Sequence, residues 1–169
     1  ILNLLETGIE QLMTEEGIEL VIIQFTHVLR DELFNSLFDK NKKYSDFLDT
    51  YIKMLLYRIQ TKCNNLSFDK NGKNKSVPFL LMSWYDDVAD IIESVYPDNL
   101  VKFEYNDLKF NNIESLLKQK NMMISDNFPE THDSHPSIDC HFIIGESILD
   151  KIKSMGIKFD YKTLVWNDN

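Results

Sequence analysis

A run of apolar residues between Thr14 and Lys40 constrains the possible folds of this chain more than any other stretch. Its bulky side chains recur at the helical period, at Ile18, Val21, Ile22, Phe25, Val28, Leu29, Leu33, Leu37 and Phe38. Thr14 is a favourable N-cap, and Glu15 and Glu16 complement the positive end of a helix dipole. At 1.5 Å per residue the run predicts a helix of roughly 38 Å, long enough to form the spine of a helical bundle.

Other segments of the first half also predict helices. Residues Ile1–Met13 form a short amphipathic pattern, and Ser45–Lys62 repeats apolar residues at the helical period. Because the connection after Lys40 is short, we expect the Ser45–Lys62 helix to lie antiparallel to the spine. Pro78 suits the first turn of another helix, which would run to Tyr96 before Pro97 stops it.

The second half mixes strand and helix signals. In chain order it predicts a strand at Leu100–Tyr105, a short helix from the capping pattern of Asn111 and Glu114 to Lys120, an irregular segment at Met123–Cys140, a helix at Ser147–Met155 ended by Gly156, and a hairpin over Ile157–Trp166. The expected fold is therefore mostly α with a small β component (α+β). We expect a single domain spanning 1–169, with a helical half (1–96) and an α+β half (97–169).

The cellular setting is inferred from what the sequence lacks. No apolar run approaches the roughly 20 residues of a membrane span, and Ile1–Leu5 is too short for a secretory signal. Cys63 and Cys140 are too few for a disulfide scaffold, which favours reduced thiols. We therefore expect a cytoplasmic protein.

Negative charge is concentrated in one part of the chain. The net charge is −9, and the stretch from Ser83 to Asp107 contains seven acidic residues and one base, Lys102. Such a field disfavours nucleic acids and anionic membranes and favours a basic partner. On a helix, Asp86, Asp87, Asp90 and Glu93 would face solvent as a set of unpaired, mutually repelling carboxylates.

Two motifs have metal-ligating character. The segment Asp86-Asp87-Val88-Ala89-Asp90 resembles the aspartate-rich motif of terpene and prenyl-diphosphate synthases, a resemblance that implies Mg²⁺ bound by the clustered carboxylates. No second metal-binding motif accompanies it. The other motif places His132, His135, Cys140 and His141 within ten residues, but their spacing fits no standard zinc site. We expect no catalytic residue, no bound metal and no cofactor.

In its small size, acidic charge and lack of catalytic motifs, the protein resembles the immunity proteins of bacterial toxin systems. That resemblance implies a non-enzymatic protein that inhibits a basic nuclease toxin, with no nucleic-acid or membrane partner. The expected partner-binding residues are Asp86, Asp87, Asp90, Glu93 and Glu104, with Trp84 and Tyr85 as aromatic anchors. The alternatives are a viral or phage protein that modulates its host through binding, and a metal-dependent enzyme using Asp86, Asp87 and Asp90.

Overall fold

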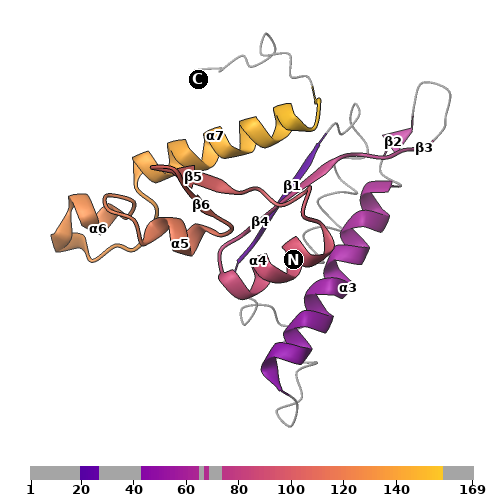
Figure 1. Ribbon diagram of the computed structural model, residues 1–169, viewed down its shortest axis with the longest axis horizontal. Helices are drawn as coiled ribbons and strands as arrows, with labels where there is room; N and C mark the ends of the chain where they lie inside the picture. The colour runs from indigo at the N-terminus through magenta and orange to yellow at the C-terminus, as the bar shows by residue number, and fades with distance from the viewer. Residues whose placement is uncertain (1–19, 27–42, 65–66, 69–73, 158–169) are drawn as a thin grey trace, which may run out of the picture.

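The computed structural model describes residues 20–26, 43–64, 67–68 and 74–157 (Figure 1). Over these residues the chain combines helices and strands, as the α+β prediction requires. In chain order the elements are β1 (Val21–Phe25), α3 (Tyr44–Asn64), β2 (Ser67–Phe68), β3 (Asn74–Lys75), β4 (Phe79–Ser83), α4 (Asp86–Val95), β5 (Phe103–Tyr105), β6 (Leu108–Phe110), α5 (Ile113–Leu117), α6 (Ile124–Asn127), the 3-10 turn η2 (Pro129–Thr131) and α7 (Ile138–Ser154).

Parallel strands form the centre of the described fold. β1 and β4 pair in parallel, with Val21 opposite Phe79 and Phe25 opposite Ser83. On the other side of β4, Leu81 forms a parallel bridge with Leu100. All five residues of β4 are buried, which is usual for a parallel strand covered on both faces. The shorter pairs β2–β3 and β5–β6 are antiparallel.

Successive side chains of β4 enter two different cores, because neighbouring residues of a strand point to opposite faces. Phe79 and Leu81 pack with side chains of β1, α3 and α4. Leu80 and Met82 pack with side chains of α5 and α7. Figure 1 shows the same arrangement, with β1 and β4 between α7 on one side and α3 with α4 on the other. The described fold is therefore three layers deep: helices, parallel strands and helices.

The predicted Thr14–Lys40 helix is wrong where the structure describes it, because Val21–Phe25 form β1. The apolar residues of this five-residue run match the helical period only by coincidence. Three consecutive β-branched residues, Val21, Ile22 and Ile23, favour an extended chain instead. The rest of the predicted spine, at 14–19 and 27–40, lies outside the described residues.

The predicted Pro78–Tyr96 helix is also wrong in its first part. Phe79–Ser83 form β4, and α4 begins only at Asp86. Pro78 precedes the strand rather than opening a helix, and its carbonyl accepts a hydrogen bond from Val21 N at 3.0 Å. The half predicted as helical, 1–96, therefore contains both central strands.

Other predictions hold with shifted bounds. The Ser45–Lys62 helix is confirmed as α3, and the predicted strand at Leu100–Tyr105 is confirmed in part as β5. The N-cap of α5 is Asn112 and not Asn111. Gly156 follows α7 with φ 73°, the left-handed conformation expected of a residue after a helix.

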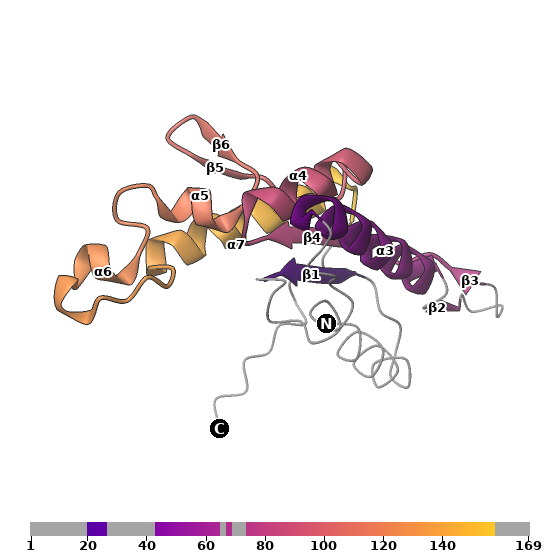
Figure 2. The same ribbon diagram turned by 90° about the horizontal axis from the view of Figure 1, so that it is seen from below.

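The second half contains more helix than predicted. α7 begins at Ile138 rather than Ser147, and α6 with η2 occupies part of the segment predicted to be irregular. The Ile1–Met13 helix and the hairpin beyond Ile157 lie outside the described residues. Among the helices described, none is both long enough and apolar enough to cross a bilayer. In Figures 1 and 2, α6 and the β2–β3 pair lie at opposite ends of the long axis.

Candidate functional site

The carboxyl ends of the parallel strands are joined to the start of α5. Trp84 N donates to Phe25 O at 2.9 Å, so the residue after β4 is tied to the end of β1. Glu114 N donates to Trp84 O at 2.9 Å. Ligands of open parallel sheets bind outside this edge.

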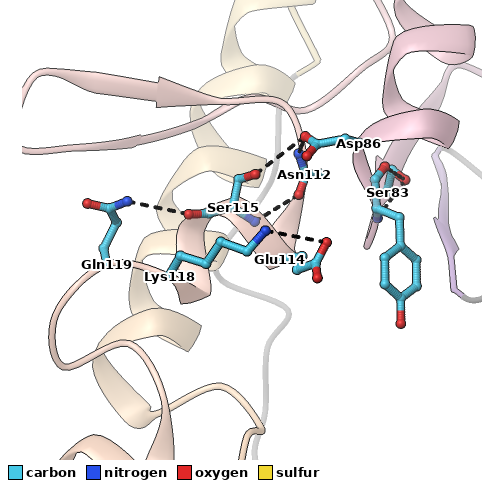
Figure 3. Close-up of polar contacts among 8 residues, drawn as sticks. Ser83, Asp86, Asn112, Glu114, Ser115, Lys118 and Gln119 are labelled. Atoms are coloured by element: carbon cyan, nitrogen blue, oxygen red, sulfur yellow. Dashed lines mark hydrogen bonds and ion pairs between the residues drawn. The ribbon is translucent and has the colours of Figure 1, made fainter.

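A buried asparagine connects α4 to α5 at this edge (Figure 3). Asn112 is 1% exposed. Its side-chain oxygen accepts from Ser115 N at 2.8 Å, which caps α5, and its amide nitrogen donates to an Asp86 carboxylate oxygen. Ser115 Oγ donates to the same oxygen at 3.3 Å. Asp86 is thus held by side chains of this chain and stabilises the junction.

Other predicted acidic residues also have partners within the chain. Glu93 pairs with Lys102 and accepts from Asn111 Nδ2 at 2.7 Å. Glu104 lies 3.8 Å from Lys109 Nζ in an exposed pair. The expectation of four unpaired carboxylates is therefore wrong for Asp86 and Glu93.

Two carboxylates of α4 have no cationic partner among the described residues. Asp87 and Asp90 are exposed, and no cationic side chain of the described residues pairs with either. Asp87 Oδ1 accepts from Val88 N at 2.8 Å, within its own helix. Burial and the nearby Asp87 charge raise the pKa of the Tyr44 hydroxyl.

The two predicted aromatic anchors are half-buried at the same edge. Trp84 packs against the core formed with α5 and α7. Tyr85 is the N-cap residue of α4, and its carbonyl accepts from Ser83 Oγ at 2.8 Å. Both residues therefore have structural contacts, and only part of each ring is available to a partner.

The most distinctive polar pair lies in the loop before α7. His135 Nδ1 is 2.6 Å from Asp133 Oδ1, and His135 N donates to the same oxygen at 2.9 Å. The hydrogen bond from the His135 backbone lowers the pKa of the Asp133 carboxyl below its usual 3.8. The hydrogen bond from the His135 ring lowers it further, by a smaller amount. Because an ionised carboxylate only accepts hydrogen bonds, the neutral form of the His135 ring would carry its proton on Nδ1 and its lone pair on Nε2.

Backbone hydrogen bonds hold this loop against the start of α6. Ile124 N donates to His135 O at 3.0 Å, and Ser125 N donates to Asp133 O at 2.9 Å. Ser137, the N-cap of α7, donates from Oγ to Asn121 O at 2.8 Å. Both members of the pair are therefore fixed at the backbone, although 78% of the His135 side chain is exposed.

The four residues considered for zinc differ in burial. Cys140 is fully buried, and burial raises the pKa of its thiol to about 11, whereas His132, His135 and His141 are exposed. Within the described part of the chain, no group of three or more His, Cys, Asp or Glu residues is placed to hold a metal. The histidines therefore do not share a metal site with Cys140.

No family model, curated protein or solved structure matches the chain. From the sequence, His135 was a candidate metal ligand only, and its pairing with Asp133 was not predicted. A signal was present, because an aspartate side chain commonly accepts from the backbone two residues ahead, which brings that residue's side chain close.

Proposed function

We propose that the protein is a hydrolase in which His135 acts as general base and Asp133 orients it. The observation that carries the proposal is the 2.6 Å hydrogen bond between His135 Nδ1 and Asp133 Oδ1. The proposal differs from the expectation of a protein without enzymatic activity. It is supported by the exposed imidazole held by a carboxylate, which is the arrangement used by general bases.

The pair supplies a complete proton cycle for hydrolysis of a carboxylic ester. Nε2 takes a proton from water as the water oxygen attacks the carbonyl carbon, and the Asp133 carboxylate stabilises the imidazolium that forms. The imidazolium then returns the proton to the leaving alkoxide as the ester C–O bond breaks. The products are a carboxylic acid and an alcohol, and His135 is restored to its neutral form.

The surroundings of the pair favour this chemistry. The hydrogen bonds from Ile124 and Ser125 fix the backbone of both residues, so little reorganisation is needed when substrate binds. α7 begins three residues after His135, and the N–H groups of a helix's first turn favour negative charge such as that on a tetrahedral intermediate. The exposed ring gives water and substrate access to Nε2.

Hydrolysis of p-nitrophenyl acetate by the full chain tests the proposal. We expect saturable hydrolysis, which nonspecific imidazole catalysis does not produce. His135→Ala should lower kcat/KM by about a hundredfold or more, and Asp133→Asn should also lower it. His132→Asn is the matched control, because His132 is a neighbouring exposed histidine with φ 50°, a conformation that asparagine tolerates. Equal rates for the wild type and His135→Ala would contradict the proposal.

A second proposal rests on a separate observation, the exposed pair Asp87 and Asp90 on α4. These carboxylates suit a basic protein partner, such as the nuclease toxin that an immunity protein inhibits or a host protein bound by a viral or phage factor. Exposed charge pairs act mainly on association rate.

A further inference from the structure

Large apolar side chains lie exposed on α7 close in sequence to the Asp133–His135 pair. Ile138 is 75% exposed and Phe142 is 68% exposed. They are four residues apart, so they lie on the same face of the helix. With His141 they line a hollow of about 240 Å³. Contiguous exposed apolar surface commonly marks a binding site.

We propose that Ile138 and Phe142 bind the apolar acyl chain of the ester that His135 hydrolyses. This inference rests on the proposed function and adds a substrate class to it. The two features are joined through the backbone, since Ser137 caps the first turn of α7 and His135 is held two residues before it. A substrate carbonyl at His135 would therefore leave its acyl chain close to the start of α7.

The size and extent of the surface point to a chain longer than acetate. The hollow exceeds the roughly 150 Å³ that accommodates a benzene molecule in a protein cavity. The same helix face continues to Gly145 and Leu149. At Gly145 an added Cβ would meet no atom within 4 Å, and Leu149 is 39% exposed. From Ile138 to Leu149 the helix rises about 16 Å, enough for a medium-length alkyl chain to lie along it.

Chain-length selectivity tests the inference. We expect kcat/KM for p-nitrophenyl octanoate to exceed that for the acetate by at least tenfold in the wild type. Phe142→Ala should reduce this octanoate-to-acetate ratio at least fivefold. Tyr57→Ala is the matched control, because Tyr57 is an aromatic residue of α3 with the same 68% exposure as Phe142. It should leave the ratio unchanged, and thermal unfolding of each variant reports whether the fold is intact.

A binding measurement separates this inference from the proposed function. Octanoate added to the His135→Ala variant should shift the Ile138 methyl signals in NMR spectra, and Phe142→Ala should abolish the shift. His135-dependent hydrolysis without chain-length selectivity would overturn the acyl-chain site and leave the hydrolase proposal standing. If no ester is hydrolysed, the hydrolase proposal fails, and with it the acyl-chain role, even where octanoate still binds. A dimer that Phe142→Ala dissociates would assign the surface to a second copy and also overturn the inference.

Discussion

At the scale of single residues, the spacing of two positions between Asp133 and His135 determines which hydrogen bonds they form. One carboxylate oxygen accepts from both the backbone and the ring of a residue two positions ahead. The sequence motif His132-Asp133-Ser134-His135-Pro136 could have indicated this turn. It could not indicate the hydrogen bonds from α6 that fix the loop, because these join residues whose pairing depends on the fold.

The titration of Asp133 gives a prediction about pH. Because its folded-state pKa lies below the usual 3.8, its hydrogen bonds stabilise the fold at higher pH. This contribution is lost as pH falls through the folded pKa. We expect the Asp133 carboxyl carbon to titrate below 3.8 in an NMR pH series. In His135→Ala the midpoint should rise only part of the way, since the backbone donor, the larger cause, remains. A wild-type midpoint at or above 3.8 would contradict the pairing.

Asn112 gives a second prediction at this scale. Asn112→Asp retains an acceptor for Ser115 N but replaces the donor to Asp86 with a second carboxylate. We expect this variant to lose about 1–3 kcal/mol of unfolding free energy in urea titrations. Adding Asp86→Asn restores a donor facing an acceptor and should recover most of the loss. Purely additive effects in this double-mutant cycle would show that the two side chains act independently.

At the scale of elements, the sequence predicted helices well where apolar periodicity ran long. α3 matches its prediction closely because its buried residues, from Leu48 to Cys63, keep the helical period over about four turns. β1 and β4 were missed because each is a run of only five, mostly apolar residues. Periodicity cannot distinguish such a run from a helix segment, and only the β-branched residues of β1 favoured a strand.

The helix and strand interpretations of Val21–Phe25 predict opposite effects on stability when two adjacent residues are replaced. In the predicted helix, Ile22 belongs to the apolar stripe and Ile23 only widens it. In β1, Ile23 is 7% exposed and Ile22 is 44% exposed. We therefore expect Ile23→Ala to cost about 2–5 kcal/mol of unfolding free energy and Ile22→Ala about 1 kcal/mol or less. The reverse order in urea unfolding would favour the helix.

At the scale of the whole molecule, the parallel strands separate the two candidate surfaces. α4, with Asp87 and Asp90, packs in one core, and α7, which follows the Asp133–His135 pair, packs in the other. Figure 1 shows the two helices on opposite sides of β1 and β4. The proposed functions therefore use different faces, and a substitution on one face should leave the other unaffected.

The location of negative charge, rather than its total, decides whether α4 binds a basic partner. Asp87→Lys with Asp90→Lys changes the net charge from −9 to −5. Asp139→Lys with Glu146→Lys changes it equally but on exposed residues of α7. If α4 is the docking surface, only the first double variant should slow association with a basic protein captured on the wild-type chain. We expect a slowing of about tenfold or more at low salt in stopped-flow measurements.

Raising the ionic strength from 0.01 M to 0.1 M shortens the Debye length from about 30 Å to about 10 Å. The wild-type association rate should therefore fall toward that of the Asp87→Lys, Asp90→Lys variant as salt is added. Hydrolysis of a neutral ester involves no such long-range attraction, so its rate should change little over the same range. If both double variants slow association equally, net charge alone attracts the partner, and α4 is not its docking surface.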